Sequence, residues 1–120
     1  MDFNSLRTKN GSAAETLLIV DDDVINRGIL ENIFLPFYTI EEAENGRVGL
    51  EKILAEPDRL CAILLDVVMP EMDGIEVLKH LLEQDLLNKI PVFLITAEAS
   101  DSTMKEAYQM GVMDVISKPV

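Results

Sequence analysis

The chain has 120 residues, of which 48% are apolar, and a formal net charge of −12, so it can form one packed domain and is too apolar for disorder. The acidic charge argues against direct binding of nucleic acid or an anionic membrane by this segment, and the apolar runs are too short to span a bilayer. The first residues lack the apolar core of a secretory signal, and a single cysteine, Cys61, permits no internal disulfide, so we expect a reducing cytoplasm.

Residues 1–15 have no periodic pattern and contain Asn10-Gly11-Ser12, which predicts a flexible leader followed by one domain over 16–120. From Thr16 onward, short apolar runs alternate with stretches of helical period. The predicted strands are 17–20, 38–43, 62–65, 92–95 and 112–116. The predicted helices are 24–35, 47–56, 75–84 and 101–110. This alternation predicts an α/β fold with a parallel sheet and right-handed crossovers.

Two helices have clear apolar faces. The predicted core positions are Ile25, Ile29, Leu30 and Ile33 in the first helix and Ile75, Leu78, Leu81 and Leu82 in the third. Pro36 and Gly111 are expected to end helices, and Pro91 to open the fourth strand. Three strands are apolar throughout, which indicates a sheet covered on both faces.

Polar side chains follow four of the five strands. Asp21, Asp22 and Asp23 come after the first strand and Asp66 after the third, while Thr96 ends the fourth and Lys118 follows the fifth. Ligands of an open parallel sheet bind beyond the carboxyl ends of its strands, so these groups are expected to meet at one edge. Carboxylates, a hydroxyl and an ammonium suit a site for a cation and a phosphoryl group.

Four segments resemble the receiver domains of two-component response regulators, including a bacterial chemotaxis regulator. They are LLIVDDD, LLDVVMPEMDG, LITAEAS and ISKP, and their order and spacing match that family over residues 16–119. The resemblance implies a doubly wound, flavodoxin-like five-stranded sheet of order 2-1-3-4-5. It also implies a signalling domain rather than an enzyme, with a histidine kinase or histidine phosphotransfer protein as donor and an output domain or partner protein as target.

The resemblance also implies the site residues. Asp66 is expected to be the phosphoacceptor, and Asp21, Asp22, Asp66 and the backbone carbonyl of Val68 are expected to bind Mg²⁺, which prefers such oxygen ligands. Thr96 is expected to donate a hydrogen bond to the phosphoryl group, and Lys118 to pair with it.

Several residues have simpler interpretations. We expect Asp23 to cap the first helix and Asp73-Gly74 to form the turn that caps the third. His80 lies off the apolar stripe and is expected to be solvated, and Cys61 is expected to be a small core residue.

The sequence departs from the family pattern in two places. Val115 stands three positions before Lys118, where many members carry an aromatic residue that follows the threonine's movement. The chain given also stops at Val120, whereas the family has a fifth helix after the Lys-Pro pair. We therefore expect a C-terminally incomplete receiver domain, whose bare sheet face is covered by a further helix or drives dimerisation.

Two other functions are weighed against the phosphoacceptor. A non-phosphorylated docking receiver would be expected to lack an acidic or lysine position, and none is missing. A small Mg²⁺-dependent aspartyl-phosphate phosphatase of the haloacid dehalogenase kind usually carries a second aspartate two residues after the nucleophile, where this chain has Val68.

Overall fold

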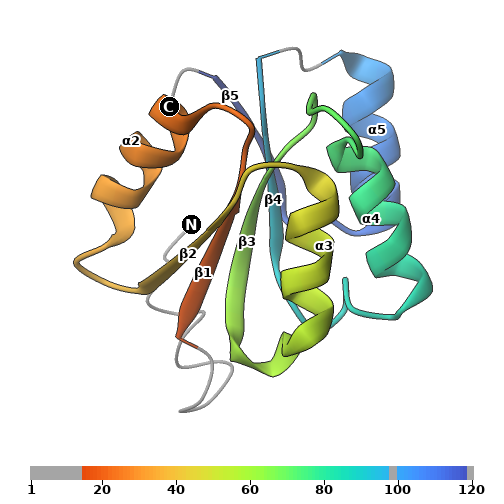
Figure 1. The fold of residues 1–120 in the computed structure, drawn as a ribbon. Coiled ribbons are helices and arrows are strands. Elements are labelled where there is room, and N and C mark those ends of the chain that lie inside the picture. Colours follow the sequence, from red (N-terminus) through yellow and green to blue (C-terminus); the bar gives the residue numbers. More distant parts are fainter. Residues whose placement is uncertain (1–14, 98–99, 119–120) are drawn as a thin grey trace.

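The computed structural model describes residues 15–97 and 100–118, which form a five-stranded sheet with helices on both faces (Figure 1). The leader expected over 1–15 therefore lies outside the described residues except for Glu15, as do Glu98, Pro119 and Val120. The strands are β1 (Thr16–Val20), β2 (Thr39–Ala43), β3 (Leu60–Asp66), β4 (Val92–Thr96) and β5 (Asp114–Ser117). The helices are α2 (Val24–Phe34), α3 (Gly46–Ala55), the short 3₁₀ helix η1 (Pro57–Arg59), α4 (Gly74–Glu83) and α5 (Asp101–Met110).

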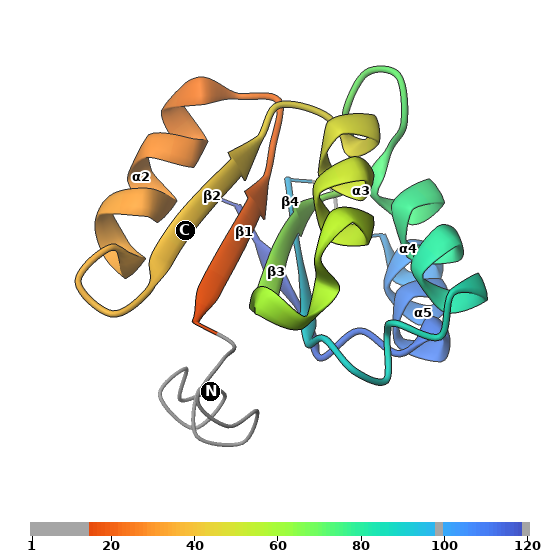
Figure 2. The ribbon, with the colours of Figure 1, turned by 60° about the horizontal axis from the view of Figure 1, so that its bottom comes forward.

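All strand pairs are parallel, and the order β2-β1-β3-β4-β5 confirms the expected topology. The chain moves one way from β1 to β2 and the other way through β3, β4 and β5. Because the crossovers are right-handed, α2 lies on one face of the sheet and α3, α4 and α5 lie on the other, as Figure 2 shows. The carboxyl ends of β1, β3, β4 and β5 consequently meet at one edge.

Each α-helix begins with a side-chain cap on its first turn. Asp23 accepts from the backbone N–H of Ile25, and Asp73 accepts from that of Glu76, as predicted. Asn45 caps α3 and Ser100 caps α5 in the same manner. These caps satisfy backbone N–H groups in the first turn of each α-helix.

The sheet separates two apolar cores. The larger core lies between the sheet and α3, α4 and α5, and β3 is buried along its whole length. The smaller core joins Leu30 of α2 to alternate residues of β1, β3 and β4, and it contains Cys61, as expected for a small core residue. His80 is exposed, also as expected. None of the helices in the described part of the chain is long and apolar enough to cross a membrane.

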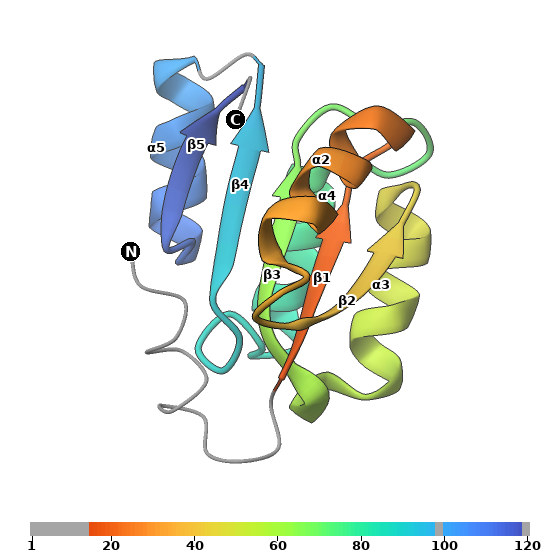
Figure 3. The same ribbon diagram turned by 90° about the vertical axis from the view of Figure 1, so that its left-hand side faces the viewer.

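The predicted apolar face of the first helix is wrong. Leu30 is 3% exposed, but Ile25, Ile29 and Ile33 are 69%, 43% and 47% exposed. Seen from the side of α2 in Figure 3, the helix lies over β1 and β2. Leu30 and Phe34, one turn apart, face the core there, so the isoleucine stripe is turned outward.

Smaller corrections concern α4 and the strands. Val77 takes the core place expected for Leu82, which is exposed. The last strand begins at Asp114 rather than at 112, while Val112 enters the core from the preceding loop. Phe93 and Ile95 of β4 are buried, and the exposed apolar side chains include Ile25, Ile29 and Ile33 of α2. The expected need for a further covering helix stays a prediction.

Candidate functional site

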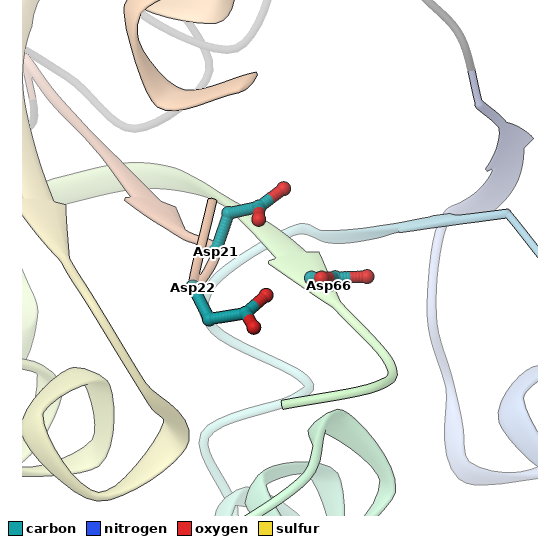
Figure 4. Close-up of side chains that lie close together, drawn as sticks. All are labelled: Asp21, Asp22 and Asp66. Carbon is teal, nitrogen blue, oxygen red and sulfur yellow. The ribbon is translucent and has the colours of Figure 1, made fainter. Parts of the chain in front are cut away.

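Three carboxylates meet at the carboxyl edge of the sheet (Figure 4). Asp21 and Asp22 directly follow β1, and Asp66 is the last residue of β3. One carboxylate oxygen from each of the three lies within 4.8 Å of the others. Asp21 and Asp66 are only 2% and 5% exposed, whereas Asp22 faces solvent. The sequence predicts that these carboxylates lie together, and the parallel register of β1 and β3 explains why they do.

Asp21 is held in place by its own backbone as well as by its side chain. Its N–H donates to the carbonyl of Ala43 at 3.1 Å, and Nη1 of Arg27 donates to its carbonyl at 2.6 Å. One carboxylate oxygen accepts from the N–H of Asp23 at 2.9 Å. The position of this carboxylate is therefore set by contacts from β2 and α2.

The ammonium of Lys118 lies between two of the carboxylates. Its Nζ is 3.0 Å from Oδ2 of Asp21 and 3.2 Å from Oδ2 of Asp66. The backbone N–H of Lys118 donates to the carbonyl of Thr96 at 2.8 Å, which anchors the residue to the end of β4. Sequence reasoning paired Lys118 with a phosphoryl group; in this structure it pairs with the carboxylates.

Burial and charge shift the titration of this cluster. Burial, with repulsion by Asp21 next, raises the pKa of Asp66 to about 6, although Lys118 acts in the opposite direction. Burial alone would lower the pKa of Lys118, but its hydrogen bond to Asp21 and the charge of Asp66 raise it overall. The same ion pair thus keeps the ammonium charged without fully offsetting the desolvation of Asp66.

A pocket of about 370 Å³ opens over Asp66. Its lining residues are Asp22, Asp23, Asn26, Asp66, Val68, Thr96, Ala97 and Lys118. Thr96 is buried at the end of β4, and the side chain of Val68 is largely exposed at the mouth. Sequence reasoning missed Asn26 and Ala97, although Asn26 lies one turn after Asp22 and Ala97 directly follows Thr96.

The donor set suits a hard divalent cation. It consists of carboxylate oxygens, and Lys118 leaves part of their charge unbalanced. Oxygen donors of this kind are what Mg²⁺ prefers, and two of the three carboxylates are already buried beside one another. The residues present therefore fit a magnesium ion.

The fold and this site together define a class of signalling protein. The family model described as the response regulator receiver domain matches residues 17–120. The chain therefore belongs to the response regulator receiver family, whose members are signalling domains of two-component and chemotaxis systems and bind Mg²⁺ at an acidic pocket.

Individual relatives agree with this assignment. A probable cyclic di-GMP phosphodiesterase of Vibrio cholerae is 34% identical over 105 residues, covering 88% of this chain and 23% of that protein. A histidine kinase of Formosa agariphila is 38% identical over 104 residues, covering 87% of this chain and 7% of that protein. The chain thus spans less than a quarter of the length of either curated relative.

A solved structure shows the same fold. It is the CheX–CheY–BeF₃–Mg²⁺ complex of Borrelia burgdorferi, with a TM-score of 0.82, 30% identity, and coverage of 88% of this chain and 79% of that one.

Proposed function

We propose that this receiver domain accepts a phosphoryl group on Asp66 from a histidine kinase or a histidine phosphotransfer protein, and that it then controls an output domain or partner protein. One observation carries the proposal. The carboxylate of Asp66 lines an open pocket, and two further carboxylates and the ammonium of Lys118 lie beside it. Receiver domains interact with such histidine-containing donors, which supports the choice of donor.

The transfer step needs no further nucleophile. A carboxylate oxygen of Asp66 attacks phosphorus, the phosphorus–nitrogen bond of the phosphohistidine breaks, and the imidazole leaves with the bonding electron pair. Hydrolysis of the resulting acyl phosphate returns the carboxylate and inorganic phosphate. Because a carboxylate is a modest nucleophile, the rate depends mainly on positioning and on neutralising charge.

We assign the metal ligands to the carboxylates of Asp21, Asp22 and Asp66 and the backbone carbonyl of Val68. A bound Mg²⁺ would neutralise these carboxylates and the oxygens of the incoming phosphoryl group. The carbonyl ligand allows any side chain at Val68, whose isopropyl group is exposed.

Thr96 and Lys118 respond to the new group. The hydroxyl of Thr96 donates a hydrogen bond to a phosphoryl oxygen, and Lys118 exchanges its contact with Asp66 for one with the phosphoryl group. Movement of Thr96 shifts the following loop and α5, which biases two pre-existing arrangements of that face.

The test is labelling with acetyl phosphate and Mg²⁺, read by intact mass. One stoichiometric phosphoryl group is expected on the wild-type chain and none on Asp66→Asn, which keeps the shape of the site. Asp58→Asn, an exposed position on η1, is the matched control and should label normally. Labelling of Asp66→Asn to the wild-type level would show that the acceptor is another residue.

The same assay separates the two alternatives. A docking receiver would give no adduct on the wild-type chain, whereas a phosphatase would release phosphate continuously without accumulating a stoichiometric adduct. Neither result is compatible with a phosphoacceptor that carries one phosphoryl group per domain.

The wider setting is part of the proposal. We place the domain in the cytoplasm. We also propose that Ile25, Ile29 and Ile33 of α2 are covered, either by a further amphipathic helix after Val120 or by a second copy of the chain. Light scattering of this chain beside one extended by about fifteen residues, or about four helical turns, tests the choice. A monomer of equal melting temperature in both cases would contradict it.

A further inference from the structure

The loop between β3 and α4, residues 67–73, follows Asp66 and carries Val68. Both ends of this loop are held by hydrogen bonds between residues close in the sequence. The N–H of Gly74 donates to the carbonyl of Val67 at 2.7 Å, and Asp73 caps α4. These contacts define the ends of the loop but not its middle, where Pro70, Glu71 and Met72 lie.

The middle of the loop is held by a residue from another element. Asn45, only 8% exposed, donates from Nδ2 to Oε2 of Glu71 at 2.8 Å. Its Oδ1 accepts from the N–H of Val48 at 2.9 Å, so one side chain caps α3 and ties the loop to it. Arg47 also lies near, with Nε 3.8 Å from the same oxygen of Glu71, but that pair is half exposed and adds little.

Two backbone features accompany this contact. Glu71 has φ of +66°, a left-handed conformation that is uncommon in residues other than glycine. At Gly46, next to Asn45, a β-carbon would collide with the carbonyl of Met72 and come within 2.9 Å of Val77. The start of α3 and the loop therefore touch backbone to backbone.

We propose that Asn45 and Glu71 are positioning residues, which hold loop 67–73 so that the carbonyl of Val68 faces the cation. The inference rests on the proposed magnesium site. A loop released from this tie would spend part of its time with the carbonyl turned away, so the cation would lose one ligand for that part of the time. Affinity for Mg²⁺, rather than the chemistry at Asp66, is the quantity the tie controls.

The decisive variant is Asn45→Asp. Aspartate caps helices as well as asparagine does, so the start of α3 is kept. The variant lacks the N–H group that donates a hydrogen bond to Glu71, and it places a second carboxylate next to that of Glu71. We expect Mg²⁺ to bind roughly tenfold more weakly, as is typical when an outer contact of a metal site is lost. The added negative charge would by itself strengthen cation binding. Weaker binding of Mg²⁺ by this variant would therefore be caused by the lost hydrogen bond.

Rescue distinguishes positioning from a general structural effect. Glu71→Gln alone keeps an oxygen for the amide of Asn45 and should bind Mg²⁺ nearly as wild type does. Combined with Asn45→Asp, it restores the bond with donor and acceptor exchanged, so affinity should return. If Asn45→Asp fails to fold, Glu71→Ala removes the same bond while leaving the cap on α3, and it should weaken binding similarly.

The chain offers a matched control. Nδ2 of Asn88 donates to Oδ1 of Asp85 at 2.8 Å in the loop before β4, at the opposite edge of the sheet. Asn88→Asp makes the same chemical change and adds the same charge far from the site. Its affinity for Mg²⁺ should equal that of the wild-type chain.

Mg²⁺ binding is measured by calorimetry of the metal alone, beside the urea midpoint and acetyl phosphate labelling. The tie predicts weaker binding in Asn45→Asp, recovery in the double variant, and full labelling once Mg²⁺ is saturating. Wild-type affinity in a folded Asn45→Asp variant, or no recovery in the double variant, would overturn the inference. A wild-type chain that binds no Mg²⁺ would instead contradict the proposed function.

Discussion

At the scale of single residues, the stability of the metal-free site depends on the charge of Asp66. Its pKa in the folded chain, about 6, lies above the ordinary 3.8 because of burial and of repulsion by Asp21. Protonation therefore favours the folded state. Stability should fall as pH rises from about 4 through about 6, and the loss should be complete above that range.

This linkage predicts the effect of Asp66→Asn. Without Mg²⁺, the variant should be more stable than wild type at pH 7.5 by on the order of 1–2 kcal/mol, allowing for solvent at the open pocket. The difference should shrink toward pH 5, where wild-type Asp66 is largely protonated. Urea unfolding in chelator at several pH values measures it. A variant that is less stable at pH 7.5 would contradict a raised pKa of Asp66 in the folded chain.

Asp22 separates metal binding from folding. It is exposed, unlike Asp21 and Asp66, so Asp22→Ala should change the unfolding free energy of the metal-free chain by less than about 0.5 kcal/mol. It should weaken Mg²⁺ binding and acetyl phosphate labelling together, because both depend on the same carboxylate. If the wild-type chain is labelled equally well in excess chelator, phosphorylation does not require the metal.

At the scale of elements, α2 shows that an apolar stripe does not have to be the buried one. Leu30 and Phe34 contact the core, while Ile29 beside Leu30 is exposed. Leu30→Ala should cost about 2–4 kcal/mol through the cavity it leaves. Ile29→Ala should cost less than about 0.5 kcal/mol in the monomer. Urea unfolding at low protein concentration compares them, and equal losses would mean that the stripe is covered in solution.

Hydrogen bonds of Tyr108 join α5 to β5 beside Val115. Val115 packs on the larger core, and its N–H donates to Oδ1 of Asp114 at 2.8 Å and to the hydroxyl of Tyr108 at 3.3 Å. Tyr108 in turn donates to Asp114 at 2.9 Å. These bonds occupy an N–H of β5, which is an edge strand of the sheet.

Two variants test this face. Tyr108→Phe should speed hydrogen exchange of the Val115 amide without changing Mg²⁺ affinity, because the hydroxyl is lost far from the metal ligands.

Val115→Ala should alter signalling through packing alone, since no ring is present to change rotamer. Equal burial of Val115 in metal-free and phosphoryl-analogue-bound structures would agree. A large rearrangement centred on Val115 would not.

At the scale of the whole molecule, the chain carries a net charge of −12, and three carboxylates lie together at one edge. Binding of Mg²⁺ to the folded state alone should stabilise it by about 2.7 kcal/mol at a concentration one hundred times Kd. For a domain of this size the melting temperature should rise by roughly 10 °C. Thermal unfolding with and without Mg²⁺ measures the shift, and Asp22→Ala should reduce it. An equal shift in that variant would place the stabilising ion elsewhere.

The sequence by itself determined the class of fold and the order of its elements. Alternating apolar runs and helical periods located all five strands and all four α-helices of the described chain, with ends off by at most two residues. Asp23 and Asp73 were identified as caps because a cap is a local interaction between a side chain and the next turn. The meeting of Asp21, Asp22, Asp66, Thr96 and Lys118 followed from a general rule, that parallel strands end at a common edge.

Only the tertiary structure decided the contacts between segments distant in the chain. It showed that Lys118 pairs with Asp21 and Asp66. It also showed that Asn45, at the start of α3, donates a hydrogen bond to Glu71 in the loop before α4. It also showed which side of α2 faces the sheet. Periodicity reports that a helix has an apolar side, but the angle at which the helix packs depends on the shape of the sheet beneath it, and that shape is formed by residues far away in the sequence.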